Sequence, residues 1–180
     1  MNFVNLLFSL GVDSLLLMLP IVVAVVLHMC VVKLDTLAFL KIPLSPKLFG
    51  NNKTWRGFVA MPLFAALAIW PMRHLELFSS LKVPVLSLGL LIGLAYSLAE
   101  LPNSYLKRRM GVPPGKRSER YVGLFILLDQ TDSGVGCALV YIVFGGIPWI
   151  TALTGVVVGI CIHLAVNFAL YWIGIRKEPL

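Results

Sequence analysis

The chain has few charged residues. They make up 13% of its 180 residues, about half the roughly 25% of ordinary soluble domains. Hydrophobic residues make up 59%, against about 45–50% in such domains. This composition excludes an ordinary soluble protein and predicts an all-α integral membrane protein, with a single membrane domain over 1–180. No room is left for a separate soluble catalytic domain, so any chemistry must come from the membrane helices and their loops.

Signals of several other classes are also missing. No Lys or Arg precedes the first apolar run, so the basic region of a cleaved signal peptide is absent, and we expect this run to be retained. The three cysteines lie in apolar runs without CxxC spacing, which indicates small buried side chains rather than a disulfide framework. A Walker A loop, G-x-x-x-x-G-K-[ST], does not occur, which excludes that mode of phosphate binding.

Five apolar runs approach the ~20 residues that cross a bilayer. They predict transmembrane helices at about 14–32, 57–72, 83–101, 121–144 and 150–175. Thirteen basic residues fall after the first and third runs and in the tail, against Arg73 and Lys82 in the other connections. The positive-inside rule therefore predicts the N-terminus outside, the C-terminus inside and two basic cytoplasmic loops. The thirteen are Lys33, Lys41, Lys47, Lys53, Arg56, Lys107, Arg108, Arg109, Lys116, Arg117, Arg120, Arg176 and Lys177.

Two carboxylates interrupt the fourth apolar run. Asp129 and Asp132 are three residues apart and share one helical face with Ser133. A charge at membrane depth costs roughly 2.5–3.5 kcal/mol by insertion measurements, and two like charges this close need a cation. Mg²⁺ suits them because it takes one or two carboxylates together with substrate phosphates; the alternative is structural pairing with arginines. Glu100, at the edge of the third run, either pairs with nearby basic residues or completes the metal site.

The segment 50–57, G-N-N-K-T-W-R-G, precedes the second run. Lys53 and Arg56 supply positive charge, and Asn52 and Thr54 supply uncharged hydrogen-bonding groups. The helix N-terminus that follows favours an anion. Composition alone leaves two interpretations open, an ordinary juxtamembrane anchor and a phosphate site, and favours the anchor.

A second basic cluster, Lys107, Arg108 and Arg109, follows the third run, with Ser104 one turn upstream. Arginine suits bidentate contact with phosphate, and lysine acts as a point charge. The pattern therefore indicates a second group of phosphate ligands.

A polar stripe runs along the fifth span, where His163, Asn167 and Tyr171 follow one another at i, i+4 and i+8. Such a stripe often holds helices together through hydrogen bonds. The alternative interpretation, which is functional, places His163 and Asn167 in the wall of the cavity that would hold the metal and phosphate. His28, on the first span, is interpreted as structural.

Basic loops beside a carboxylate pair indicate a Mg²⁺ site that handles phosphate. A nucleoside triphosphate fits because its charge needs several cations, and phosphoryl or nucleotidyl transfer is mostly positioning and charge neutralisation. A site within the membrane implies a lipid as the second substrate. Nucleic acid is not expected as a partner.

Three motifs occur in order on these spans: N-K-T-W-R-G at 52–57, S-x-x-K-R-R-x-G at 104–111 and D-Q-x-D at 129–132. They resemble the CDP-archaeol synthase family, which is related to the CDP-diacylglycerol synthases. The resemblance extends over nearly the whole chain, including H-x-x-x-N-x-x-x-Y at 163–171 and K-x-P at 177–179. The chain departs from the family's usual residues at four places, which are Asn51-Asn52 (usually Asp-Gly), Glu100 (Asp), Asn103 (Gly) and Ser133 (apolar).

The resemblance implies transfer of the cytidylyl group of CTP to a lipid phosphate, either an isoprenoid ether lipid phosphate or one like phosphatidic acid. Mg²⁺ is the implied cofactor, the products are a CDP-activated lipid and pyrophosphate, and the site lies at the cytoplasmic face of the cell membrane. Asp129, Asp132 and Glu100 are the implied metal ligands, and Lys107 acts with the two aspartates in catalysis. The implied nucleotide and phosphate ligands are Asn52, Lys53, Thr54, Arg56, Ser104, Lys107, Arg108 and Arg109.

Two other functions remain open at this stage. A CTP-dependent lipid or polyprenol kinase would transfer the γ-phosphate instead. A small cation or lipid transporter would explain the intramembrane acids but not two basic loops. The CDP-alcohol phosphotransferases are excluded because their D-G-x-x-A-R run is absent.

Overall fold

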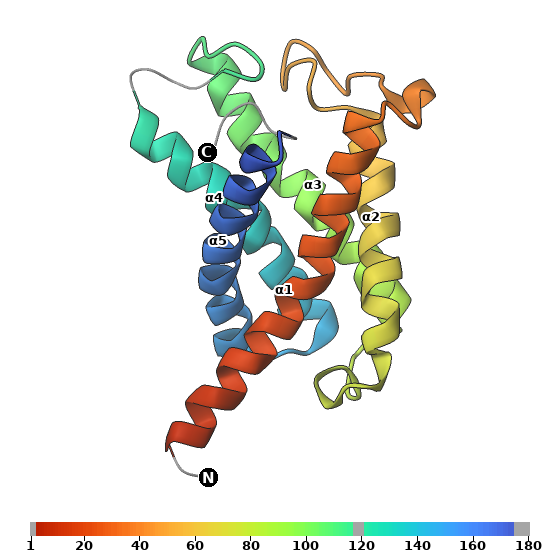
Figure 1. The fold of residues 1–180 in the computed structure, drawn as a ribbon, viewed down its shortest axis with the longest axis vertical. Helices are drawn as coiled ribbons and strands as arrows, with labels where there is room; N and C mark the ends of the chain where they lie inside the picture. Colours follow the sequence, from red (N-terminus) through yellow and green to blue (C-terminus); the bar gives the residue numbers. More distant parts are fainter. Residues whose placement is uncertain (1–2, 117–120, 175–180) are drawn as a thin grey trace.

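The computed structural model describes residues 3–116 and 121–174, and Figure 1 shows the fold. The predicted five-helix architecture is confirmed, because each long helix is long and apolar enough to cross a membrane. Within the described ranges there is no strand, and the pairing of Pro43 with Thr54 is an isolated bridge. The helices are α1 (Phe3–Lys33), α2 (Trp55–Ile69), α3 (Val85–Arg109), α4 (Val122–Val140) and α5 (Trp149–Trp172). Short helical turns occupy Ala38–Leu40, Trp70–His74, Glu76–Phe78 and Tyr141–Gly145.

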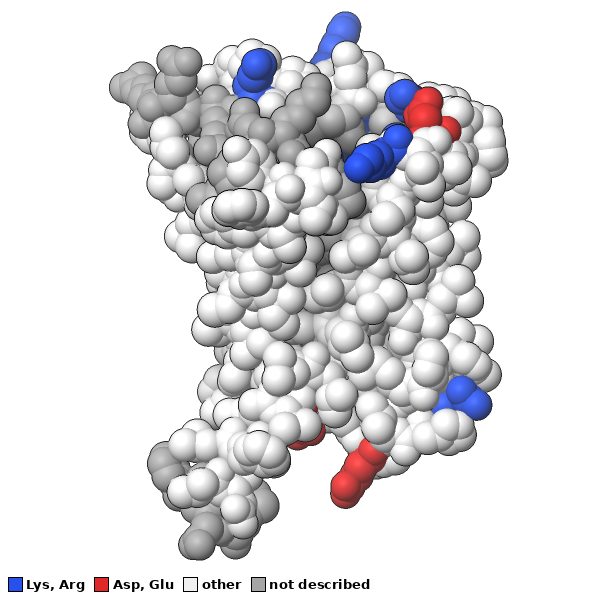
Figure 2. Space-filling view, viewed as in Figure 1, with Lys and Arg blue, Asp and Glu red and all other residues white. Residues whose placement is uncertain are grey.

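The outer surface of the bundle is apolar. Large side chains such as Leu67, Leu139 and Val157 are more than half exposed although they lie within the helices. Lys and Arg gather at one end of the molecule, and the middle of the visible face carries neither sign of charge (Figure 2). Such a belt suits lipid tails, which need no polar contact and disfavour charge.

Glycines allow α3 to lie against both of its neighbours. A Cβ on Gly93 would come within 2.4 Å of Pro62 Cα on α2, and a Cβ on Gly136 of α4 would come within 2.6 Å of Ala99 Cβ on α3. Small residues at such crossings let helix backbones approach closely, which is how membrane helices gain packing contacts. The close α3–α4 crossing is what brings the polar residues of these two helices together.

Helix α3 continues beyond the predicted end of the third span. Lys107, Arg108 and Arg109 were counted in the following loop, but they form the last turn of the helix. The hydrophobic run ends where the charged residues begin, but the backbone hydrogen bonds of the helix continue through them. Positive side chains are also favourable at a helix C-terminus. Their side chains therefore project from a regular helix rather than from a loop.

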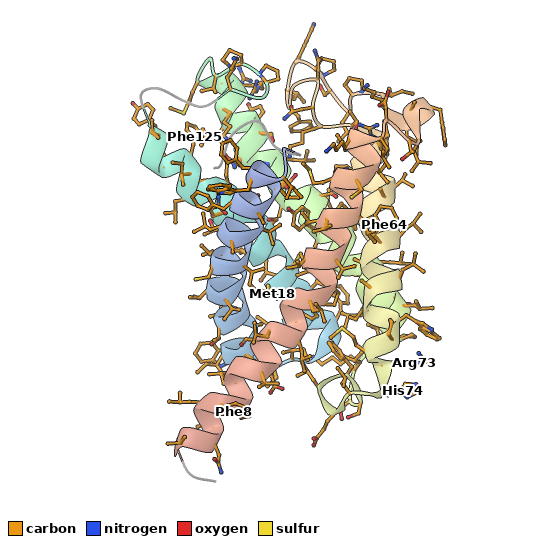
Figure 3. All side chains as sticks on the ribbon, in the orientation of Figure 1. Phe8, Met18, Phe64, Arg73, His74 and Phe125 are labelled. Carbon is orange, nitrogen blue, oxygen red and sulfur yellow. The ribbon has the colours of Figure 1, made fainter. Side chains whose placement is uncertain are left out.

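The two long connections lie at the same end of the bundle. The 34–54 connection between α1 and α2 and residues 110–116, which follow α3, both lie at the top of Figure 1, and α1 begins at the opposite end. In Figure 3, Phe125 lies at the loop end, whereas Phe8, Arg73 and His74 lie at the other. The side chain of His163 and the residues Arg117, Arg120, Arg176, Lys177 and Pro179 lie outside what the structure describes.

Candidate functional site

One amide joins the two intramembrane acids. Asn103 Nδ2 on α3 donates to Asp129 Oδ1 at 2.6 Å and to Asp132 Oδ2 at 2.9 Å, both on α4. The i, i+3 spacing on α4 turns both carboxylates toward α3, as the sequence predicts. Asp129 is 7 residues from the start of α4 and Asp132 is 10, roughly 10 and 15 Å along the helix. The pair therefore lies in the loop-side half of the bundle.

Lys107 is the second partner of Asp129. Its Nζ lies 2.5 Å from Oδ1 and 2.6 Å from Oδ2, and 5.4 Å from the centre of the Phe125 ring. The Lys107 side chain is 16% exposed and that of Asp129 is 45% exposed. Asp129 is thus partly exposed and is already matched with a cation from α3.

The first loop, residues 34–54, is held against α3 by a second ion pair. Lys53 Nζ donates to Glu100 Oε2, and both side chains are largely shielded. Glu100 and Lys53 also lie within electrostatic range of Asp132. The two lysines and three carboxylates therefore form one charged cluster where the loop meets α3 and α4.

Arg56, a predicted phosphate ligand, is buried next to the start of the first loop. It is 5% exposed, and its Nη1 donates to Asp35 Oδ1 at 3.0 Å and to the Thr36 carbonyl at 3.3 Å. Hydrogen bonds from Lys41 and Arg56 hold the pKa of the Asp35 carboxyl below its usual value. Arg56 thus ties the start of the loop to the start of α2.

The two basic loops touch each other. Gly50 has a φ of 88°, and a Cβ there would lie 2.9 Å from Pro114 Cγ in the other loop. A residue with a side chain would be strained by this φ and would also meet the proline. Backbone bonds from Leu44 N to the Lys53 carbonyl (2.8 Å) and from Trp55 N to the Ile42 carbonyl (3.0 Å) fold the first loop back on itself. Lys53 is thereby presented toward α3.

Buried polar atoms without a partner occur on residues that follow members of the charged cluster closely in the sequence, and on Asn103 itself. Within the described residues they are Arg56 Nε, Asn103 Oδ1, Arg108 Nε and Nη1, and Gln130 Oε1. Folded proteins leave few such atoms unpaired, so each of them calls for an explanation. A charged ligand that enters between α3, α4 and the loops would supply acceptors for the arginine nitrogens.

The aspartate pair fits a hard divalent cation. One nitrogen contacts an oxygen of each carboxylate, so these two oxygens converge on one point. Mg²⁺ is typically bound through one or two carboxylates, with water and phosphate completing its octahedron. Among the described residues no group of three His, Cys, Asp or Glu side chains is placed to hold a metal ion. Glu100, the predicted third ligand, is instead engaged by Lys53.

A mostly apolar pocket adjoins the aspartate pair. Gln130 and Ser133, which follow Asp129 and Asp132 in the sequence, line it together with Tyr96 of α3. Side chains of α1 and α5 complete the wall, among them Met18, which lies midway along the bundle in Figure 3. The pocket therefore runs from the neighbourhood of the charged cluster into the membrane part of the molecule.

The other predicted ligands are less closely engaged with the charged cluster. Ser104 is buried on α3 beside Asn103, and Asn167 is buried on α5, where its neighbour Val166 lines the pocket. Arg109 is exposed, and its Nε donates to Tyr105 Oη at 2.8 Å. The remaining two, Asn52 and Thr54, lie in the first loop on either side of Lys53.

Two residues near the site were not predicted to act there. Asn103 was named above only as a departure from the family pattern. His28 was assigned a structural role; its Nε2 lies 3.5 Å from where a Cβ on Gly57 would be. The signal for Asn103 is a polar residue four before Lys107, on the helical face that carries the basic cluster.

Comparison with known proteins identifies the family of the chain. The family model of CDP-archaeol synthase (CarS-like) matches residues 3–180. The CDP-archaeol synthases of Methanoregula boonei and Methanoculleus marisnigri are each 32% identical over 148 residues, covering 74% of this chain and 81% of theirs. That of Methanococcoides burtonii is 30% identical over 152 residues, covering 74% of this chain and 82% of its own. No solved structure matches significantly. The chain belongs to the CDP-archaeol synthase family, and is a CTP-dependent cytidylyltransferase of the membrane.

Proposed function

We propose that this protein transfers the cytidylyl group of CTP to a lipid phosphate at the site between α3 and α4, with Mg²⁺ held by Asp129 and Asp132. The observation that carries the proposal is the convergence of two carboxylates with Lys107 and Lys53 at the loop end of a membrane bundle. A nucleoside triphosphate carries several negative charges, and its transfer is catalysed mainly by positioning and neutralising them. The site supplies both.

In the proposed reaction, an oxygen of the lipid phosphate attacks the α-phosphorus of CTP. A new P–O–P bond forms, the bond between the α-phosphorus and its bridging oxygen to the β-phosphate breaks, and pyrophosphate leaves with that oxygen. The attacking oxygen is already ionised at neutral pH, because the second pKa of a phosphate ester is about 6. No side chain has to remove a proton, and no covalent enzyme intermediate is required.

The residues of the chain bind and orient the two substrates in this proposal. Bound Mg²⁺ would neutralise charge on the phosphates. Lys107 and Lys53 would turn from their carboxylates toward the phosphate oxygens, and the unpaired nitrogens of Arg108 would donate hydrogen bonds to the same phosphates. Glu100 as a third metal ligand, and contacts from Asn52, Thr54, Arg56, Ser104 and Arg109, stay predictions.

The pocket beside Ser133 supports a lipid as the second substrate. Its wall is mainly apolar, but it includes the buried, unpaired Oε1 of Gln130. The lining suits an amphipathic molecule, which would place its phosphate near Asp132 and its chains toward Met18. Each buried CH₂ contributes about 0.8 kcal/mol whichever chain carries it, so the pocket favours lipids as a class, with archaeal-type isoprenoid ether lipid phosphates suggested by the relatives.

Placement of the loops in the cytoplasm completes the proposal. Both long loops lie at the end of the bundle that carries most of the basic side chains (Figure 2). The positive-inside rule puts such loops in the cytoplasm, where CTP is made. The site would then face the cytoplasm from the cell membrane.

Labelled CTP tests the proposal directly. The purified protein is incubated with Mg²⁺, a panel of lipid phosphates and CTP labelled at either the α- or the γ-phosphate. We expect α-label in the lipid product and release of pyrophosphate. Transfer of γ-label would indicate a kinase, and absence of both labels from every lipid, with no CTP-dependent rise in melting temperature, would contradict nucleotide chemistry.

A further inference from the structure

Asn103 occupies the point where the two aspartates converge. Its side chain is 93% shielded from solvent, its Nδ2 contacts both carboxylates, and its Oδ1 is buried without a partner. The amide nitrogen has two hydrogens, and both are used on the carboxylates. A cation that binds the same two oxygens must displace them.

The amide has a second end of almost the same shape. Rotation about the last side-chain bond of Asn103 exchanges Nδ2 and Oδ1, and so puts an oxygen between Asp129 and Asp132 in place of the two hydrogens. Side-chain amide oxygens are ordinary ligands of hard divalent cations. The same rotation moves Oδ1 out of a position where it lacks a donor and places the amide nitrogen there.

We propose that Asn103 is a third oxygen ligand of the divalent cation and that its amide reverses when the cation binds. The inference rests on the proposed metal site at the aspartate pair. In the metal-free protein the Nδ2 end holds two like charges together. In the metal-bound protein the Oδ1 end joins Asp129 and Asp132, so that α3 and α4 both contribute ligands.

A ligand role and a purely structural role for Asn103 predict different effects of its removal on metal affinity. If the amide acts solely as a hydrogen-bond donor, it competes with the cation for the carboxylates, so its removal should leave metal affinity unchanged or raise it. If it is a ligand, its removal should lower metal affinity. The sign of the change therefore separates the two roles without any measurement of activity.

Titration with Mn²⁺ alone, followed by the electron paramagnetic resonance signal of free Mn²⁺, measures this sign on the whole protein in detergent. We expect Asn103→Leu to weaken binding at least about tenfold and Asn103→Asp to bind at least as tightly as the wild type. Ser97→Ala is the matched control, because Ser97 is buried on the same helix and donates to the Gly93 carbonyl. Binding by Asn103→Leu that equals or exceeds the wild type overturns the inference.

A cysteine at the same position gives a second test if the leucine variant does not fold. Thiolate prefers soft metals such as Cd²⁺ to Mn²⁺. We expect Asn103→Cys to gain a sulfur-to-cadmium charge-transfer absorbance that the wild type, with its native cysteines, does not show. A folded Asn103→Cys protein that gains no such band overturns the direct ligand role.

The labelled-CTP experiment keeps this inference separate from the proposed function. A wild type that makes CDP-lipid while Asn103→Leu keeps full Mn²⁺ affinity refutes the ligand role alone. A wild type that transfers neither label refutes the proposed function. Mn²⁺ affinity that is insensitive to both Asp132→Asn and Asn103→Leu refutes the metal site and the inference together.

Discussion

Lys53 of the first loop and Glu100 of α3 form an ion pair that closes the loop over the polar site. Their side chains are 21% and 28% exposed, whereas the nearby pair Lys41–Asp35 is more than half exposed on both sides. Shielded pairs lose more when one partner is reversed than exposed pairs do. The contact therefore links the loop to α3, the helix that packs against the aspartates of α4.

Exchange of the two charges separates the structural role of this pair from phosphate binding. Lys53→Glu and Glu100→Lys should each lower the melting temperature, because each creates a like-charge contact. The double variant should recover about 1 kcal/mol of unfolding free energy through restored pairing, measured by thermal unfolding in detergent. CTP affinity should stay low in the double variant, because the cation has moved from the loop to α3.

The exposed Lys41 provides the control for this exchange. Lys41→Glu should change the melting temperature little, since exposed pairs contribute about 0–1 kcal/mol. A double variant that recovers both stability and CTP affinity would show that Lys53 has no contact of its own with the nucleotide.

Asp132 is the residue whose charge the proposed reaction needs most. Asp132→Asn keeps the size of the side chain but removes a carboxylate from the pair, so CDP-lipid formation should fall by at least about 100-fold. Incorporation of α-label from CTP measures this, with membrane insertion checked on the same preparation. Asp13→Asn is the matched control, because Asp13 is also an intrahelical acid but lies in the first half of α1. Activity of Asp132→Asn near that of Asp13→Asn would rule out the metal role.

The sequence predicts well what depends on length and local spacing. Five helices follow from runs near the bilayer thickness, and the shared face of Asp129 and Asp132 follows from helical geometry. Contacts between distant segments do not follow in this way. The bond of Asn103 to both acids depends on how closely α3 and α4 cross, and this in turn depends on Gly136 against Ala99. The predicted end of the third span was also too early, because it was set where the apolar residues end. The hydrogen bonds of α3 continue through the basic turn that ends at Arg109.

Acid should remove the contribution of Asp35 to stability. Its folded pKa lies below the usual value of about 3.9, because Lys41 and Arg56 stabilise the carboxylate. The contribution is therefore present above pH ~4 and is lost as the pH falls through the folded pKa. The melting temperature of Asp35→Asn should be below that of the wild type at pH 7, and the gap should close in acid. Glu76→Gln, at the opposite end, controls for loss of charge, and a gap that is constant with pH would contradict the argument.

Gly93 fixes the separation of α2 and α3 and, through α3, the position of the site. A Cβ there would lie 2.4 Å from Pro62 Cα and 2.5 Å from the Met61 carbonyl oxygen, and backbone atoms cannot move aside as a flexible side chain can. Gly93→Ala should therefore lower the unfolding free energy by about 1–3 kcal/mol, despite the better helix propensity of alanine. Gly11→Ala is the matched control, because a Cβ on Gly11 meets nothing within 4 Å. That variant should be unchanged or more stable by up to about 1 kcal/mol. Equal melting temperatures for the two variants would show that the α2–α3 crossing relaxes freely, and that close packing at Gly93 does not hold α3 in place.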